Sequence, residues 1–321
     1  MARRLIIGID LGGTKISGGI GNLEGEILHI VERPTDTSSA EAVVNQVIDV
    51  TRELAVANPI GELSAIGIGV PGITVSETGL VVWAPNLPDW RDIPLGEILR
   101  KEFGVPVLVE NDVDVAVLGE WWKGAGQGAQ NIFLMAIGTG IGGGILINGQ
   151  LYKGSGGVAG AVGWFVIGED RLFKEEYKAG GSAEILAAGP GIGRRGREAA
   201  RCKETKMTEL AGGDIKKIDS RIVFEAARLG DPVAQEVVND TAKYLGIVAA
   251  NVISLLNPEV LIIGGGVADA GDIILKPVAE IAREHAQPFS AKQVRIEKAM
   301  LGNRAGLIGA LCLAARSVNN L

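Results

Sequence analysis

The sequence predicts an α/β protein made of two similar halves. Its 321 residues are enough for two domains of ~100–200 residues each. Each half opens with a strand, a turn rich in Gly and Thr, and a second strand, as in IGIDLGGTKISGGI (7–20) and MAIGTGIGGGILI (135–147). Strand-like and helical stretches then alternate. The repeated opening favours a duplicated fold with a cleft between its halves, although any Gly-rich β-hairpin gives a similar pattern.

The first half begins as a β-hairpin and continues with alternating helices and strands. Apolar runs separated by Gly-rich turns predict the opening strands, and apolar residues at helical spacing after a Ser cap predict the first helix. The expected strands are 5–10, 16–22, 24–33, 65–72 and 105–112, and the expected helices are 38–57, 93–103 and 114–122.

A polar, Gly-rich stretch at 123–131 predicts the boundary between the halves. We expect an N-terminal domain of residues 1–120 with 303–321, and a C-terminal domain of residues 121–302. The pattern then restarts, with a largely helical region at 183–255. The expected strands of the second half are 132–138, 145–152, 260–266 and 294–300, and a closing helix is expected at 305–318.

Composition excludes several classes of function. The net charge of −7 argues against a general binder of nucleic acid or of acidic membranes. Two cysteines and two histidines leave no disulfide framework, no four-thiolate zinc site and no HExxH helix. The first apolar run ends at Asp10, too early for a signal peptide, and 132–147 contains five glycines, so neither predicts a membrane segment. We therefore expect a cytoplasmic protein.

The first chemical motif is the turn Asp10-Leu11-Gly12-Gly13-Thr14-Lys15. Two glycines in a tight turn expose backbone N–H groups that can hold phosphate oxygens. Thr14 adds a hydroxyl and Lys15 adds a cation. Asp10, at the end of the strand, is a candidate ligand for Mg²⁺, directly or through water. The alternative is an ordinary hairpin with an exposed Asp and Lys.

Two further Gly-rich turns follow strands. Gly138-Thr139-Gly140 begins a stretch that fits GxGxxG, but a strand rather than a helix follows it, which argues against a dinucleotide-binding motif. Gly264-Gly265-Gly266 follows an apolar strand and suits the close approach of adenosine. A plain strand-to-helix turn explains that feature equally well.

Glu110-Asn111-Asp112 ends an apolar strand just before a helix. Strand ends of α/β proteins face the ligand crevice. An Asp there can take the proton of an alcohol as the alcohol attacks a phosphoryl group. The alternative interpretation is that Asn111 or Asp112 only caps the helix.

Together these motifs resemble the ROK family of sugar kinases and their repressor relatives. The resemblance rests on DLGGTK (10–15), GVPG (69–72), NLPDW (86–90), ENDVDVAVLGE (110–120), IGTGIGGG (137–144), NPEVLIIGGG (257–266) and AGLIGALCLA (305–314). It implies two actin-like (ribonuclease H-like) α/β domains that close over ATP, Mg²⁺ and a sugar. It also implies a kinase rather than a repressor, because the first strand begins near Leu5 and leaves no room for a DNA-binding domain.

The resemblance assigns roles to individual residues. Asp112 is the expected general base for a sugar hydroxyl, and Asn86, Asn111 and Glu184 are expected to hold other hydroxyls. The expected nucleotide contacts are Gly12, Gly13, Thr14, Lys15, Gly138, Thr139, Gly140, Gly265 and Gly266.

The chain departs from the family pattern on the substrate side. Ala161 stands where the family has a sugar-binding Glu, Trp164 replaces a His that binds zinc and sugar, and the zinc cysteines are missing, so no zinc site is expected. Trp164 is a candidate to stack on a sugar face, which predicts a modified hexose, amino sugar or cyclitol as substrate. The alternative is that Trp164 only fills space.

Three other possibilities stay open at this stage. One is a non-catalytic sugar or nucleotide sensor. Another is polyphosphate as donor, if Lys174, Lys178, Arg194, Arg195 and Arg197 form a basic strip rather than a solvated helix face. The third concerns assembly, because the helical region 222–256 is a candidate for a homodimer interface.

Overall fold

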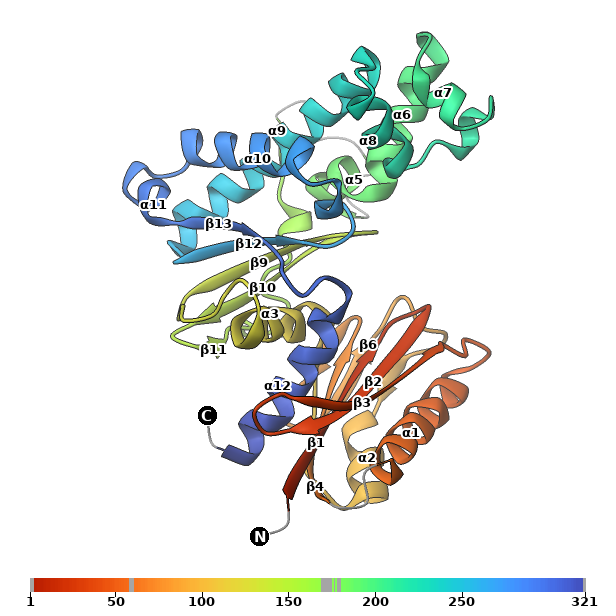
Figure 1. Ribbon diagram of the computed structural model, residues 1–321, viewed down its shortest axis with the longest axis vertical. Coiled ribbons are helices and arrows are strands. Elements are labelled where there is room, and N and C mark those ends of the chain that lie inside the picture. The colour runs from red at the N-terminus through yellow and green to blue at the C-terminus, as the bar shows by residue number, and fades with distance from the viewer. Residues whose placement is uncertain (1–2, 58–60, 169–174, 176, 178–179, 320–321) are drawn as a thin grey trace. The chain divides into compact units, whose positions relative to one another are not determined.

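The computed structural model describes residues 3–57, 61–168, 175, 177 and 180–319 (Figure 1). Its contacts divide the chain into two compact units. Unit 1 comprises residues 1–128, 144–159 and 300–321, and unit 2 comprises 129–143 and 160–299. The first division between the units, after residue 128, falls within the predicted boundary stretch 123–131. Residues 144–159 belong to unit 1, although the sequence places them in the C-terminal domain. The predicted domain boundaries stay a prediction.

A five-stranded sheet of order β3-β2-β1-β4-β8 forms the centre of unit 1. Strands β1, β2 and β3 pair antiparallel, while β1, β4 and β8 pair parallel. These strands are β1 (Arg3–Leu11), β2 (Lys15–Asn22), β3 (Ile27–Pro34), β4 (Gly61–Val70) and β8 (Val107–Asn111).

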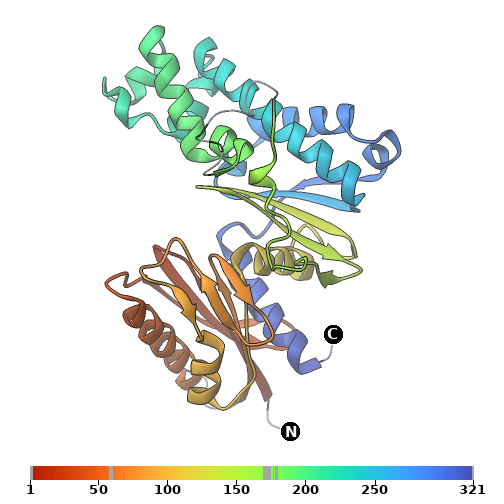
Figure 2. The same ribbon diagram turned by 180° about the vertical axis from the view of Figure 1, so that it is seen from behind.

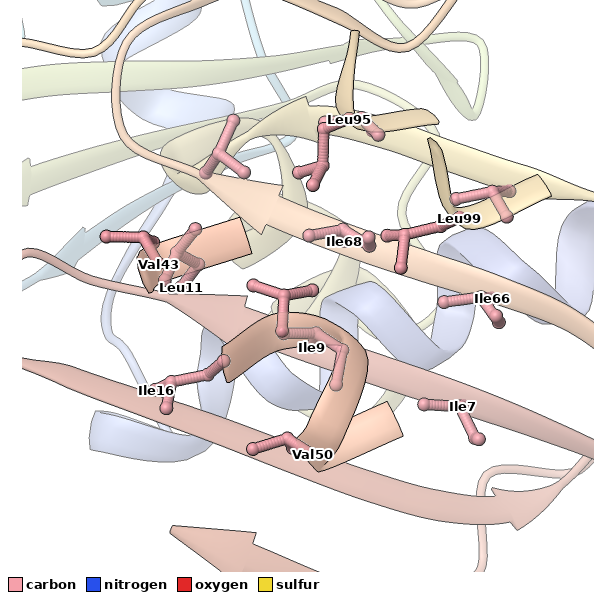
Figure 3. Close-up of a cluster of buried hydrophobic side chains, with 14 of the residues drawn as sticks. Ile7, Ile9, Leu11, Ile16, Val43, Val50, Ile66, Ile68, Leu95 and Leu99 are labelled. Atoms are coloured by element: carbon pink, nitrogen blue, oxygen red, sulfur yellow. The ribbon is translucent and has the colours of Figure 1, made fainter. Parts of the chain in front are cut away.

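Helices cover both faces of this sheet, so its parallel strands are apolar almost throughout. Helices α1 (Ala40–Val56) and α2 (Leu95–Phe103) lie on one face, where Ile7, Ile9 and Ile68 pack in the core that Figure 3 shows. Helices α3 (Asp112–Lys123) and α12 (Ala305–Asn319) lie on the other. Glycine permits this contact: a Cβ on Gly67 of β4 would lie 2.0 Å from the Ala310 carbonyl oxygen of α12.

A small three-stranded sheet was not expected from the sequence. Its order is β5-β6-β7, and its strands are β5 (Ile73–Val75), β6 (Leu80–Trp83) and β7 (Arg91–Ile93). The predicted helix 93–103 therefore starts later, at Leu95, because Arg91–Ile93 pairs with β6. Such short strands carry too few residues for a period-2 pattern to be recognised.

The second five-stranded sheet has the order β11-β10-β9-β12-β13, which repeats the topology of the first. Its strands are β9 (Ile132–Ile137), β10 (Ile141–Ile147), β11 (Gln150–Leu151), β12 (Val260–Gly264) and β13 (Arg295–Lys298), and the division between the units passes through β10. The repeated order supports the predicted duplication. The predicted single strand 145–152 is wrong, because a turn with Asn148 and Gly149 in left-handed conformations separates β10 from β11.

Helices make up most of the rest of unit 2 (Figure 2). They are α5 (Ser182–Ala187), α6 (Gly189–Cys202), α7 (Lys206–Leu210), α8 (Ser220–Arg228), α9 (Pro232–Leu256), α10 (Asp272–His285) and α11 (Pro288–Gln293). The long helix α9 packs against α10, where Gly246 meets Ile281. None of the helices in the described ranges combines the length and the hydropathy needed to cross a membrane.

Candidate functional site

The candidate base Asp112 lies in unit 1, where β8 ends and α3 begins. Asn111 caps the helix: its Oδ1 accepts the Val113 N–H at 2.9 Å, and its Nδ2 donates to the Gly72 carbonyl oxygen at 2.9 Å. Asp112 Oδ1 accepts the same Val113 N–H at 2.9 Å. The helix therefore fixes both side chains, and a hydrogen bond from the Asn111 side chain also lowers the pKa of Asp112.

The carboxyl groups of Asp112 and Asp10 both have raised pKa values. Burial raises the pKa of Asp112 to about 6, against hydrogen bonds that lower it. The pKa of Asp10, at the end of β1, is also raised to about 6, first by burial and then by the charge of Asp112. Helix α12 approaches Asp10 closely, since a Cβ on Gly306 would lie 2.5 Å from its carboxyl oxygen. Two desolvated carboxylates close to each other would gain from a shared cation.

The first Gly-rich turn is held by backbone contacts. The Gly12 N–H donates to the Lys15 carbonyl oxygen at 2.8 Å, and the Thr35 hydroxyl donates to the Gly12 carbonyl oxygen at 2.7 Å. Lys15 forms an exposed ion pair with Glu32 at 2.8 Å, and its hydrogen bond lowers the pKa of Glu32. Lys15 must therefore share its charge with Glu32 if it also reaches a phosphate.

Asn86 lies beside this turn. A Cβ on Gly13 would lie 2.6 Å from the Asn86 carbonyl oxygen, so the structure brings a predicted sugar residue next to a predicted phosphate residue. The two tryptophans near Asn86 differ: Trp83 is 42% exposed, while Trp90 is buried in the core. Trp90 is therefore unavailable to a sugar.

Sequence reasoning missed two buried acids near Asp112. Glu110 and Asp114 are each almost fully buried, and burial together with the charge of Glu110 raises the pKa of Asp114 to about 7. The sequence did carry a signal for this acidic cluster, because Glu110, Asp112 and Asp114 occupy every second position of residues 110–114. Two buried acids therefore flank the proposed base, and the charge of Asp112 in turn contributes to the raised pKa of Asp114.

In unit 2, the turn Gly138-Thr139-Gly140 connects β9 to β10. The Gly138 N–H donates to the Gly140 carbonyl oxygen at 2.9 Å, and the Gly138 carbonyl oxygen accepts the Gly189 N–H at the start of α6 at 2.9 Å. Gly265 lies against the same strand: its φ is +82°, and a Cβ there would lie 2.4 Å from the Ile137 carbonyl oxygen. The structure thus brings two of the predicted nucleotide-binding turns together.

These turns line a pocket of about 480 Å³, which adjoins a second pocket of about 590 Å³. Such volumes are typical of small-molecule sites. The first is lined by Gly138, Thr139, Gly189, Pro190, Gly193, Arg197, Asp219, Ser220, Arg221, Gly266 and Val267. The second shares Ser220, Arg221 and Gly266 with it, and adds an apolar wall from Ile222 and Phe224 of α8. The sequence carried no signal for the contribution of α8.

Glu184 contacts the same turn. Its Oε2 accepts the Ile141 N–H at 2.8 Å, and it lies so close to Gly140 that a Cβ there would be 2.5 Å away. A carboxyl group expected to hold a sugar therefore also holds the turn between β9 and β10. Trp164, at the end of a short 3₁₀ helix, is 56% exposed, so its indole ring is open to a ligand.

The arginines proposed as a basic strip are instead bonded to the protein. Arg195 donates to the Leu186 and Val237 carbonyl oxygens and to the Thr241 hydroxyl, and its guanidinium stacks on Tyr244. Arg194 and Arg197 donate to the carbonyl oxygens of Ile185 and Ile218. Both interpretations, an anion-binding strip and a solvated face, are wrong for Arg195. Lys174 and Lys178 lie outside the described residues.

Within the described ranges, no group of three or more His, Cys, Asp and Glu residues suits a metal ion. Magnesium needs fewer protein ligands, since it takes one or two carboxylates and keeps several waters. Asp10, with Asp112 nearby, fits that requirement.

The chain matches the model of the ROK family over residues 6–317. It is 36% identical to a glucokinase of Halalkalibacterium halodurans, with 100% of this chain and 98% of the relative covered. A crystal structure of a ROK family glucokinase from Streptomyces griseus, in complex with glucose and AMPPNP, has a TM-score of 0.78 at 34% identity, covering 97% of this chain and 99% of that one. The ROK hexokinase from Thermus thermophilus has a TM-score of 0.83 at 30% identity, covering 98% and 99%.

Proposed function

The chain belongs to the ROK family, and from that premise we infer that it is an ATP-dependent carbohydrate kinase with an actin-like fold. The similarity to glucokinases over the full length supports this function. The observation that carries the inference is the position of Asp112, a desolvated carboxyl at a strand end, in the same unit as the Gly12-Gly13 turn. Kinases of this kind need a base, a phosphate cradle and a metal rather than covalent chemistry.

Asp112 is the proposed general base. It takes the proton of a sugar hydroxyl as the hydroxyl oxygen forms a bond to the γ-phosphorus of ATP, and ADP leaves with the electrons of the broken P–O bond. A pKa of about 6 suits this role, because the group is ionised at neutral pH yet still basic enough to accept a proton.

The nucleotide is proposed to occupy the adjoining pockets of unit 2. Gly138, Thr139 and Gly140 are the proposed phosphate contacts of unit 2, and Gly265 and Gly266 the proposed adenosine contacts. Gly12, Gly13, Thr14 and Lys15 are the proposed phosphate contacts of unit 1. Mg²⁺ would be held at Asp10 and would neutralise charge on the phosphates. The fit rests on the desolvation of Asp10 beside a second carboxyl group.

The sugar is proposed to contact Asn86, Asn111, Glu184 and Trp164. Asn111 Oδ1 keeps one lone pair beyond its bond to the Val113 N–H, and Glu184 is held through its Oε2 by the Ile141 N–H. Trp164 offers an aromatic face in place of a polar contact, and Ala161 leaves room for a larger substituent. We therefore propose that the acceptor is a modified hexose, an amino sugar or a cyclitol rather than plain glucose.

ATP is the proposed donor, which the similarity to a glucokinase solved with AMPPNP supports. We propose a cytoplasmic location, where ATP is available. A homodimer formed through the helical region 222–256 stays a proposal, and the exposed Ile247 and Leu255 of α9 are its candidate contacts.

The test is a screen of phosphoryl acceptors with ATP and Mg²⁺, followed by identification of the phosphorylated hydroxyl. We expect transfer to a sugar hydroxyl, with glucose below the best acceptor. Binding of ATP without transfer to any acceptor would support a non-catalytic sensor instead. The double variant Ala161→Glu/Trp164→His should shift the ranking toward glucose; an unchanged ranking would mean that these positions do not determine specificity.

A further inference from the structure

A buried ion pair lies directly beside the base-bearing segment of unit 1. Lys153 Nζ lies 2.9 Å from Glu110 Oε1, and the Glu110 side chain is only 6% exposed. Ser76, between β5 and β6, donates its hydroxyl to Glu110 Oε2 at 2.8 Å and also contacts Lys153. Both oxygens of Glu110 are therefore occupied, and the three side chains come from separate parts of the chain.

Glu110 is separated from Asp112 by one residue on the same strand end. The ion pair therefore anchors the backbone directly before Asn111, the residue that caps α3, and Asp112, with which α3 begins. Lys153 also lowers the pKa of the buried Asp114, which burial and Glu110 raise. The cation therefore compensates more than one of the acids that surround the base.

Lys153 also closes a Gly-rich loop, residues 154–159. Its carbonyl oxygen accepts the Ala159 N–H at 3.0 Å, and Gly154 and Gly157 adopt left-handed conformations with φ of +67° and +70°. The loop rests on the small sheet, where a Cβ on Gly157 would lie 3.2 Å from the Thr74 carbonyl oxygen. From this loop the chain continues to Ala161 and Trp164, the positions proposed to contact the sugar.

We propose that Lys153 is a positioning residue, which through its ion pair with Glu110 ties the loop 154–159 to the strand end that carries Asp112. In this way it holds the loop and the base-bearing strand end of unit 1 in one arrangement, and we expect the binding of the sugar to depend on that arrangement. The inference rests on the proposed function, because it concerns the acceptor side of that reaction. The nucleotide contacts of unit 2 do not involve Lys153.

The test compares Lys153→Met with Lys153→Arg and measures KM and kcat for sugar and ATP separately. Lys153→Met should raise the KM for the sugar about tenfold or more and lower kcat, because small displacements of reacting groups have large effects on rate. The KM for ATP should change less than about twofold. Lys153→Arg keeps the positive charge beside Glu110 and should recover part of the activity, since the shape of the guanidinium differs from that of the ammonium group. Lys203→Met is the matched control, since Lys203 forms an ion pair of the same length, 2.9 Å, with Glu236 on the surface.

The double variant Glu110→Gln/Lys153→Met separates positioning from the burial of an unpaired charge. If positioning matters, the double variant recovers thermal stability while its sugar KM stays high. Recovery of both, or an equal change of the KM for sugar and ATP in Lys153→Met, would overturn the inference. Failure of the wild-type protein to phosphorylate any acceptor would instead contradict the proposed function, and calorimetric sugar binding to the same variants would still test the role of Lys153.

Discussion

The end of β8 in unit 1 and the pocket of unit 2 are built in opposite ways. The first collects side-chain charge, with Glu110, Asp112 and Asp114 on one short segment and two of them almost fully buried. The second consists largely of backbone, with Gly138, Gly189 and Gly266 among its lining residues. Proton transfer needs a carboxyl group with a shifted pKa, whereas a phosphate chain needs N–H groups and close approach.

The difference predicts which substitutions each region tolerates. In unit 1 a change of charge should matter more than a change of volume, since desolvation raises the pKa of Asp112 and Asp114. In unit 2 the addition of a single methyl group should matter, since a Cβ on Gly265 would lie only 2.4 Å from the Ile137 carbonyl oxygen. The following four predictions test this contrast.

The largest effect is expected for Asp112→Asn. The variant keeps the volume of the side chain and removes the base, so kcat should fall at least ~10²-fold while ATP still binds. Steady-state kinetics and a nucleotide titration measure the two quantities. Asp240→Asn, which alters an exposed ion pair with Lys243, is the control and should leave kcat unchanged. Near wild-type turnover of Asp112→Asn would show that another group is the base.

The pH dependence of kcat/KM should report the ionisation of Asp112. The pKa of Asp112 is raised to about 6, so the base is ionised above that pH and protonated below it. The value of kcat/KM should therefore be highest above pH 7 and fall at least about tenfold per pH unit below 6, and more steeply if Asp10, whose pKa is also raised to about 6, must be ionised. Circular dichroism at each pH would show that the protein stays folded. A flat profile between pH 5 and 7 would exclude Asp112 as a base with this pKa.

Two adjacent glycines of unit 2 should respond differently to alanine. Gly265→Ala forces a left-handed conformation and a clash with Ile137, and should destabilise the fold by about 1–3 kcal/mol. A Cβ on Gly266 meets no described atom within 4 Å, so Gly266→Ala should keep its melting temperature. It should still raise the KM for ATP severalfold if adenosine approaches there. Equal melting temperatures and equal ATP affinities would contradict the assignment.

The smallest effect is expected for Lys15→Met. Lys15 is about half exposed and paired with Glu32, so solvent and its partner reduce its field at a phosphate. The KM for ATP should rise by less than about tenfold, with little change in stability. Glu32→Gln breaks the same ion pair but keeps the cation, and it should not raise the KM. A hundredfold loss in Lys15→Met would mean that Lys15 leaves Glu32 to bind the nucleotide.

Much of the architecture could be predicted because it rests on local signals. The long apolar strands β1, β4 and β12 and the helices α1 and α12 appear within a few residues of their expected bounds. The Gly-rich turns and the strand-end Asp112 were found for the same reason, since each needs a specific residue type at a specific point of a strand. The repeated strand order of the two sheets agrees with the repeated opening of the two halves.

Other features could not be predicted because they depend on distant partners. Lys153 and Glu110 are 43 residues apart, and only the packing of the loop 154–159 in unit 1 brings them together. Arg195 looks like a solvated cation in the sequence, yet it bonds to Val237 and Thr241 of α9. Such contacts leave no periodic pattern, because one partner alone carries no sign of the other.

The sequence by itself determined the strand–turn–strand openings, the turn glycines and the helix that Asn111 begins, since backbone conformation and capping depend on neighbours along the chain. Only the tertiary structure decided that Glu110 and Asp114 are desolvated and that Lys153 compensates their charge. It also decided that residues of α8 line the pocket of unit 2. Burial and charge compensation depend on everything that surrounds a group, and most of those surroundings are distant in the sequence.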